Sequence, residues 1–357
     1  MVLGAIIRFI MSVLLVSILV LLIFSPSLSN NLIKILSTAS NATLQAPATT
    51  TNLSYPTTTI KANYVPQDKL VTYALSLINK DRQLYNLSNV SYSAEPSAQQ
   101  HSESMLQNAY FSHWDIYGLK PYMRYTILGG NQSIDENIAY VYNSSGVNVT
   151  NALYQMEYSM MYNDAKCCNN GHRDNILDPQ HNQVSIGVAY NATTVYFTED
   201  FIDDYINWFY GTPAFSNGMV YLNGTCADNY DLHEVLVTYD QPASSLNRSQ
   251  LKNPPYNASY GYGTTIAGIG YTEMQGNTRL TYSYGNITLN ATKYLVQGNK
   301  FGVSFNMDGI ISRYGAGEYT VMVIINETDV SPQTSFLAAT HTFFINGSGK
   351  EYIPSDV

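Results

Sequence analysis

Residues 9–24 form an uncharged, strongly apolar run that begins directly after Arg8. With the mostly apolar residues 2–7, this run is just long enough to span a bilayer as a helix. Because the positive residue precedes the run, the rest of the chain is expected on the outer side of the membrane. Cleavage as a signal peptide is the alternative interpretation, since Ser27 and Ser29 place small residues at suitable offsets. We predict that residues 1–28 form an uncleaved membrane anchor, because the apolar run is longer than the core of most signal peptides. Secretion after cleavage is the alternative localisation.

Residues 29–64 are rich in Ser, Thr and Asn, carry prolines at Pro47 and Pro56, and have almost no charge. Such a segment lacks the apolar periodicity needed to pack, so it is predicted to be a flexible stalk. The rest of the 357-residue chain is long enough for two domains of about 150 residues each. We place them at residues 65–208 and 212–357.

The charge balance argues against binding to nucleic acid. The net charge is −9, and neither half of the chain contains the cluster of Lys and Arg that phosphate binding needs. Only 12% of residues are charged, whereas Tyr occurs 31 times, so the surface is expected to be polar through hydroxyl and amide groups. Fifteen N-x-S/T sequons suit a glycosylated outer-surface protein, although an Asn-rich chain also produces such triplets by chance. The candidate glycosylation sites are Asn86, Asn131, Asn191 and Asn257.

Helical and strand patterns both occur within residues 65–208, which indicates an α/β domain. Apolar residues recur at helical spacing from Leu70 to Ile78, after Pro96, and over residues 152–162. Residues 184–189 and 194–201 are dense in β-branched and aromatic residues and are predicted strands.

After Trp208 the pattern changes to short strand-like runs separated by Gly, Asn and Pro. The best candidates are residues 218–222, 234–239, 279–284, 301–305, 318–325 and 341–345. This spacing predicts an all-β, antiparallel sandwich of immunoglobulin-like type over residues 212–357. His233 and His341 are isolated within such runs and are expected to be ordinary sheet residues.

Several motifs in the first domain follow one another in a specific order. Residues 78–82 read Ile-Asn-Lys-Asp-Arg, residues 98–105 Ala-Gln-Gln-His-Ser-Glu-Ser-Met, and residues 110–113 Tyr-Phe-Ser-His. Residues 135–139 read Asp-Glu-Asn-Ile-Ala, and residues 171–177 Gly-His-Arg-Asp-Asn-Ile-Leu. Together they resemble the CAP superfamily of cysteine-rich secretory proteins, antigen 5 and pathogenesis-related 1, also called the SCP domain. The resemblance covers about residues 67–205.

The resemblance implies an α-β-α sandwich with a cleft lined by two histidines and two acidic residues. The matching positions are His113, Glu136, Glu157 and His172. The match at Glu157 rests on Tyr154, which stands where the family often has Trp. Because the chain lacks the multiple disulfides of the animal and plant members, it is closer to the shorter prokaryotic branch.

Two neutral imidazoles and two carboxylates in one cleft would suit a divalent metal such as Zn²⁺. Without metal, the same groups could pair as imidazolium and carboxylate. Glu136 is the candidate catalytic base if a metal polarises water, but no Ser-His-Asp or Cys-His arrangement supplies a nucleophile. The alternative is a purely structural role, in which His113 and His172 cap helix ends and Glu136 belongs to a hydrogen-bonded turn. His101 is expected to pack or hydrogen-bond on the inner side of its helix.

The three cysteines are too few for a disulfide framework, and their number is odd. Cys167 or Cys168 could bridge to Cys226, whereas the adjacent pair bridges only with strain. A free thiol or a bridge to another chain stays open. Cys168 and Cys167 lie four and five residues before His172, which suggests metal ligands, but we favour a disulfide to Cys226 or plain thiols.

We favour the function of a surface-displayed binding module. Its cleft would bind a divalent metal, a small ligand, a lipid, a glycan or another protein, while the N-terminal helix holds it at the cell membrane. One alternative is a metal-dependent, peptidase-like hydrolase that uses the His/Glu tetrad. The other is a structural cell-envelope protein.

Overall fold

The structure is a computed structural model that describes residues 65–209, 213–275, 278–282, 287–332 and 334–354. The predicted anchor and stalk, residues 1–28 and 29–64, lie outside the described residues. Within those ranges, no helix combines the length and apolar character needed to cross a membrane. The described residues group into one compact unit by their contacts.

A four-stranded sheet forms the centre of the first region. Its order is β1 (Ser91–Tyr92), β3 (Gln183–Tyr190), β4 (Thr194–Asp203) and β2 (Ser133–Tyr142). Strand β1 runs parallel to β3, and the other neighbours are antiparallel. On β2, Glu136 lies opposite Asp200 and Asn137 lies opposite Glu199. The Glu-Asn motif is therefore part of a strand, and the turn considered as an alternative is wrong.

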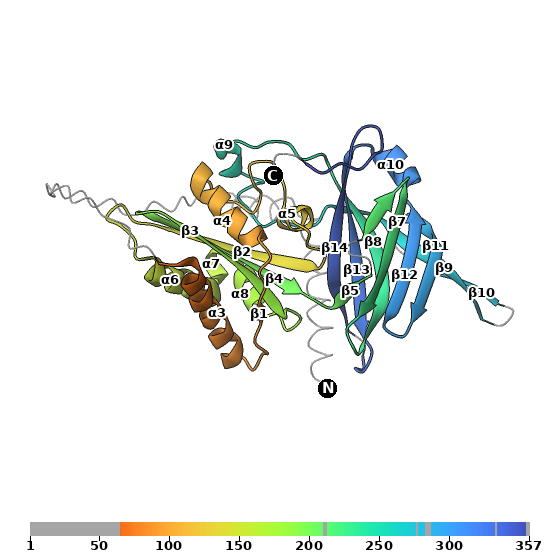
Figure 1. Cartoon of the computed structure of the whole chain (residues 1–357), viewed down its shortest axis with the longest axis horizontal. Coiled ribbons are helices and arrows are strands. Elements are labelled where there is room, and N and C mark those ends of the chain that lie inside the picture. The colour runs from red at the N-terminus through yellow and green to blue at the C-terminus, as the bar shows by residue number, and fades with distance from the viewer. Residues whose placement is uncertain (1–64, 210–212, 276–277, 283–286, 333, 355–357) are drawn as a thin grey trace, which may run out of the picture. The chain divides into compact units, whose positions relative to one another are not determined.

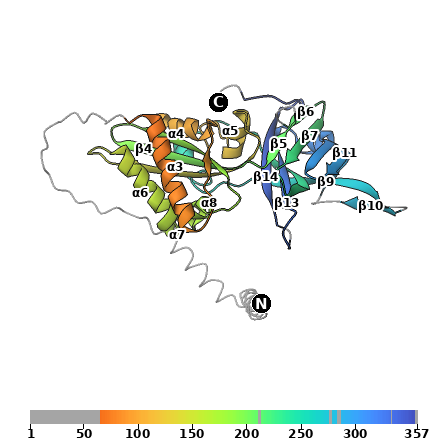
Figure 2. The ribbon, with the colours of Figure 1, turned by 60° about the horizontal axis from the view of Figure 1, so that its bottom comes forward.

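Helices cover both faces of this sheet (Figures 1 and 2). Helices α3 (Gln67–Leu84), α6 (Val149–Tyr162), α7 (Ala165–Cys168) and α8 (Gly171–Ile176) lie on one side, and α4 (Ser97–Asn108) and α5 (Pro121–Ile127) lie on the other. The apolar stripes of α3 and α6 pack on one set of alternating sheet residues, among them Ile186 and Phe197. Burying these stripes removes apolar surface from water and fixes the layers. The result is an α-β-α arrangement, as the resemblance implied.

Helix α4 approaches the sheet most closely at Gly187. A Cβ atom at this position would lie 2.0 Å from the carbonyl oxygen of Ala98. In the space that glycine leaves, Ser102 Oγ donates a hydrogen bond to the Gly187 carbonyl at 3.0 Å. This contact sets the height of α4 above the strands that carry the acidic residues.

The second region is rich in strands. Among the described residues, a ten-stranded sheet follows the path β14-β13-β8-β9-β11-β12-β7-β5, with β10 added beside β9 and β6 beside β7. The bounds are β5 (Ile206–Trp208), β6 (Ala214–Ser216), β7 (Met219–Cys226), β8 (Tyr230–Asp240), β9 (Thr264–Gln275), β10 (Thr278–Tyr282), β11 (Thr288–Gln297), β12 (Lys300–Asn306), β13 (Gly317–Glu327) and β14 (Ser335–Ile345). A short helix, α10 (Asp308–Tyr314), follows β12. Buried side chains from both ends of the path, such as Leu222, Val323 and Phe343, share one core.

The prediction missed four strands of this sheet, namely β5, β6, β9 and β11. Strands β9 and β11 run parallel, with Thr288 opposite Gly268, so the expected purely antiparallel order is wrong at this pair. The end of β9 pairs first with β10, from Tyr271 to Gln275. Strand β11 then pairs with the earlier part of β9, from Gly268 to Gly270, in the same direction.

The connection from β8 to β9, residues 241–263, runs back over the first region and is called the strap below. It contains the short helix α9 (Arg248–Leu251). The backbone N–H of Leu246 donates to the carbonyl of Ile116 at 2.7 Å. Leu246 and Leu251 are buried in one apolar cluster with Met105 and Tyr110 of the first region. The strap thus packs as a structural part of the first region.

Candidate functional site

A cavity of about 430 Å³ opens where four segments of the chain meet. Its walls come from residues 111–113, from residues 135–138 of β2, from residues around α7 and α8, and from residues 257–262 of the strap. Of the four residues predicted for the cleft, His113, Glu136 and His172 lie on this cavity. Its volume is in the range of sites for small molecules.

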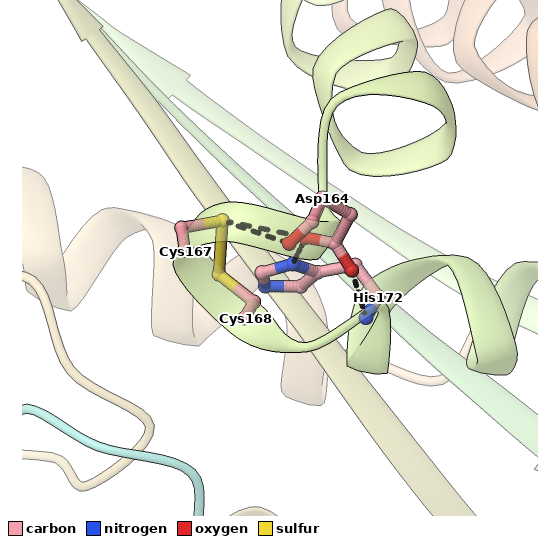
Figure 3. Close-up of side chains that lie close together, drawn as sticks. All are labelled: Asp164, Cys167, Cys168 and His172. Atoms are coloured by element: carbon pink, nitrogen blue, oxygen red, sulfur yellow. Dashed lines mark hydrogen bonds and ion pairs between the residues drawn. A yellow bond between two sulfur atoms is a disulfide. The ribbon is translucent and has the colours of Figure 1, made fainter.

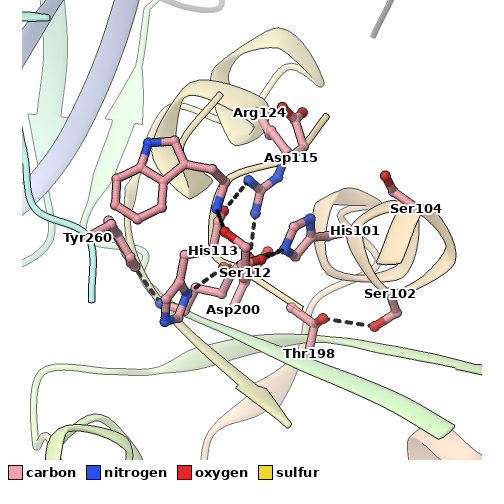
Figure 4. Close-up of polar contacts among 12 residues, drawn as sticks. His101, Ser102, Ser104, Ser112, His113, Asp115, Arg124, Thr198, Asp200 and Tyr260 are labelled. Atoms are coloured by element: carbon pink, nitrogen blue, oxygen red, sulfur yellow. Dashed lines mark hydrogen bonds and ion pairs between the residues drawn. The ribbon is translucent and has the colours of Figure 1, made fainter. Parts of the chain in front are cut away.

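His113 is held by a buried carboxylate. Its Nδ1 lies 2.8 Å from Oε1 of Glu136, and Oε2 of Glu136 accepts a hydrogen bond from Nη2 of Arg124 at 2.6 Å. Arg124 also donates to the carbonyl of His113 at 2.7 Å, so it fixes both partners (Figure 4). Burial and the nearby Arg124 charge lower the pKa of His113 to about 3. The ring is therefore neutral near pH 7, with Nδ1–H directed at Glu136 and Nε2 left as a lone-pair donor.

The carboxylates around Glu136 share one charged partner. Burial raises the pKa of Glu136 to about 7, against the opposing effect of Arg124. Burial and the charge of Glu136 raise the pKa of Asp200 to about 8, and Ser97 donates a hydrogen bond to its side chain. Because Arg124 contacts Glu136 directly, Glu136 loses its proton at a lower pH than Asp200 does.

His172 has its own carboxylate, Asp164, which was not predicted from the sequence. Nδ1 of His172 lies 2.6 Å from Oδ1 of Asp164, and the backbone N–H of His172 donates to Oδ2 at 2.9 Å (Figure 3). Asp164 is 3% exposed. Its only signal in the sequence is its place in the unusual segment 163–170 before the Gly-His motif.

Glu157 does not line the cavity. It is 2% exposed, and burial together with the neighbouring Glu199 raises its pKa well above the usual range. Glu199 accepts a hydrogen bond from Asn137 at 3.2 Å, and Asn137 also donates to the carbonyl of His172 at 3.0 Å. Glu157 is thus part of a buried layer behind the site, joined to His172 through other residues.

The strap contributes a residue that sequence reasoning missed. The backbone N–H of Glu136 donates to the hydroxyl of Tyr260 at 2.9 Å, and the ring of Tyr260 lies 5.0 Å from that of His113. Nearby, Ser112 Oγ donates to the carbonyl of Tyr256 at 2.5 Å. These contacts join residues more than 120 positions apart, so no local pattern could have indicated them.

His101 behaves as the sequence indicated. It is 1% exposed, and its Nε2 lies 2.9 Å from the carbonyl of Ser112. Burial lowers its pKa well below the usual value, so the ring is neutral and supports the loop that carries His113. His341 is likewise buried in its strand.

The cysteines pair differently from the favoured long-range bridge. Cys167 and Cys168 form a disulfide, whereas Cys226 is a buried free thiol in β7. The bridge to Cys226 is wrong because that side chain is 2% exposed in the core of the second sheet. Burial raises the pKa of the Cys226 thiol to about 12, which makes it unreactive.

Three of the predicted glycosylation asparagines, Asn86, Asn191 and Asn257, are exposed. Asn131 is half-buried, and its carbonyl accepts a hydrogen bond from the Trp208 indole at 3.1 Å. Asn257 also lies on the wall of the cavity.

An α-β-α sandwich with carboxylate-bound histidines in one cleft defines the first region as a CAP-type domain. Residues 75–201 match the family model of CAP, the Cysteine-rich secretory protein family, which confirms the resemblance seen in the motifs. No curated protein matches the chain.

Two solved structures are similar over part of the chain. An extracellular protein containing a SCP domain from Bacillus anthracis str. Ames is 24% identical, with a TM-score of 0.29; the match covers 40% of this chain and 45% of that one. An outer surface protein from Borrelia burgdorferi is 12% identical, with a TM-score of 0.30; the match covers 39% of this chain and 96% of that one.

Proposed function

We propose that this chain is a surface-anchored CAP protein whose cleft binds a divalent metal ion and, with it, a small ligand or partner. One observation carries the proposal. His113 and His172 both lie on the cavity, and each has Nδ1 bonded to a buried carboxylate. Histidine ligands in metal sites are oriented in this way, because the outer carboxylate fixes the tautomer that leaves Nε2 free.

The donor set fits Zn²⁺ through His113 and His172, with Glu136 and Asp164 as outer carboxylates. Neutral imidazoles are good ligands for this ion, and the low pKa of His113 keeps its ring neutral over the physiological range. Glu157 has no place in this set, since it lies behind the cavity wall. A bound ion would supply an electrophilic centre for a carboxylate or carbonyl of the ligand.

The chemistry of Glu136 favours binding over hydrolysis. Both of its oxygens are engaged, one by His113 and the other by Arg124. A general base must reach the water it activates, and the Glu136 side chain is fully buried behind these two contacts, which disfavours that role. Tyr260, Tyr262 and Phe111 instead offer aromatic surface to a ligand.

Zinc binding to the full chain in a mild detergent tests the proposal. Equilibrium dialysis of the oxidised protein should give one Zn²⁺ per chain, and His113→Ala should weaken binding at least tenfold. His233→Ala is the matched control, because His233 lies on β8 and contacts Asn326. Equal zinc affinity in the two variants would overturn the metal site.

The proposed localisation is the outer face of the cell membrane, with residues 9–24 as the anchor. The apolar run and the exposed asparagines of the sequons support it. Alkaline extraction of membranes should leave the chain in the pellet. Release of a chain that begins near Ser29 would show cleavage and secretion instead.

A further inference from the structure

A second set of metal-ligand side chains lies at the end of the cleft formed by α7 and α8. Asp164, Cys167, Cys168 and His172 each place one ligand atom within 4.8 Å of the others (Figure 3). We propose that this set is a redox-gated metal site. It is closed while the disulfide stands, and it binds a thiophilic divalent ion such as Zn²⁺ through two thiolates, Asp164 and His172 after reduction.

The spacing of the ligand atoms supports this assignment. Bond lengths to tetrahedral zinc place neighbouring ligand atoms roughly 3.3–3.8 Å apart. Sγ of Cys167 already lies 3.5 Å from Oδ1 of Asp164. That oxygen lies 2.6 Å from Nδ1 of His172, so an opening of roughly 0.7 Å would let an ion replace their shared proton.

Two of the four ligands are held in place whatever the state of the cysteines. Oδ2 of Asp164 accepts hydrogen bonds from the backbone N–H groups of His172 at 2.9 Å and Arg173 at 3.3 Å. The carboxylate is buried, so it cannot swing into solvent. The oxygen and nitrogen ligands are therefore close to their final positions before the metal binds, and the chemical change between the two states falls on the sulfur atoms.

The disulfide closes the site because its sulfur atoms are bonded to each other and carry no thiolate charge. A dithiol reductant opens it by giving up two electrons and two protons, which leaves two cysteine thiols and an oxidised, cyclic disulfide donor. Binding of the ion then releases both thiol protons and the proton shared by His172 and Asp164. Cys167 is exposed and Cys168 half-buried, so a reductant can reach the bond.

This inference goes beyond the proposed function and does not depend on it. The thiolate site needs neither His113 nor Glu136, whereas the cleft metal needs no cysteine. His172 could be a ligand in either site, so variants of His172 would not distinguish the two proposals. His113→Ala removes a ligand of the cleft site alone, and Cys167→Ser removes a ligand of the thiolate site alone.

Cobalt(II) is the probe, because thiolate ligation to it gives a charge-transfer absorption in the near ultraviolet. The full chain is reduced with a water-soluble phosphine, which becomes the phosphine oxide, and is desalted without oxygen. Reduced wild type should bind Co²⁺ with this absorption, titrate to one thiolate-bound ion per chain, and lose the band on adding Zn²⁺. The oxidised protein should show no band.

Cys167→Ser and Cys168→Ser each remove one sulfur ligand, so each should weaken Co²⁺ binding at least tenfold and lower the band to about half its intensity at saturation. Neither cysteine belongs to the buried core, so these variants should fold. Cys226→Ser and His113→Ala should keep it. A thiol titration of reduced wild type should find two more thiols than the oxidised protein has. If the reduced protein has these two additional thiols but shows no band, the proposal is overturned. Unchanged Co²⁺ affinity and band intensity in Cys167→Ser would also overturn it.

Discussion

Nδ1 of His113 lies 2.8 Å from Oε1 of Glu136, and the other oxygen of the same carboxylate accepts a hydrogen bond from Arg124. The carboxylate therefore does two things: it fixes the tautomer of the imidazole, and it neutralises Arg124. A change at Glu136 should affect metal binding and folding together.

Replacing Glu136 by Gln would place an amide N–H₂ group against one of the two donors. We expect the zinc affinity to fall by about 10- to 100-fold, as for other outer-shell partners of metal histidines. The free energy of unfolding should fall by about 3–5 kcal/mol, because Arg124 would be left buried without its anionic partner. Glu103→Gln, an exposed position on α4, should stay within about 0.5 kcal/mol. Dialysis and urea denaturation measure both effects, and unchanged zinc affinity in Glu136→Gln would contradict the assigned role.

Tyr260→Phe would leave the backbone N–H of Glu136 without its acceptor. An unsatisfied buried donor costs about 1–3 kcal/mol, so the free energy of unfolding should fall by that amount. Tyr256→Phe is the control, because Tyr256 contacts the first region through its carbonyl and ring. Urea denaturation of the two variants side by side should show a lower free energy of unfolding in Tyr260→Phe alone. Equal losses in both variants would show that the hydrogen bond to the Tyr260 hydroxyl does not stabilise the fold.

Stability should fall as the pH rises from about 6.5 to 8. Burial raises the folded-state pKa of Glu95, Glu136 and Glu318 to about 7 and that of Asp200 to about 8. In this window the folded chain binds protons that the unfolded chain has already lost, which makes the slope negative. His101, His113 and His341, whose pKa values are lowered by burial, oppose this slope, because in the unfolded chain about half of these rings carry a proton at pH 6.5 and almost none at pH 8. The four carboxyl groups outweigh them, since their folded-state pKa values lie within this window. Thermal denaturation should give a lower Tm at pH 8 than at pH 6.5, with a smaller drop in Asp200→Asn; a flat profile would contradict these pKa shifts.

Gly187→Ala should be strongly destabilising. The new methyl group would collide with the Ala98 carbonyl, so α4 would have to move away from the sheet. We expect a loss of about 1–3 kcal/mol, as for other overpacked cores. Gly309→Ala is the matched control, because no atom lies within 4 Å of its added Cβ in α10. The difference in Tm between the two variants measures the effect, and a stable Gly187→Ala would show that α4 is free to shift.

Local pattern was sufficient to predict most of the first region. The periodicity around Leu70, Pro96 and Ala152 corresponds to α3, α4 and α6, because each helix buries one continuous apolar stripe. The Glu-Asn motif was harder, since Glu136, Asn137 and Ile138 are buried in succession in β2, so no alternation of polar and apolar residues marks the strand. Strand β11 was missed because most of its residues are exposed or half-buried, so no apolar run marks it.

Residues of the candidate site could be predicted only where they belong to a recognisable sequence motif. His113, Glu136 and His172 were found in that way, but Asp164 was not, since it precedes its histidine by eight residues in an unusual segment. Tyr260 could not be found at all. Its contact with Glu136 spans 124 positions and depends on how the strap folds back.

The strap also limits how this protein can be divided. A CAP domain trimmed at residue 208 would lose residues 257–262, Tyr260 among them, and with them one wall of its own cleft. Transplanting the first region into another protein would therefore carry over the histidines but not the pocket that surrounds them. A substitution at residues 257–262 would therefore reshape the cleft of the first region from a segment that belongs, by chain order, to the neighbouring sheet.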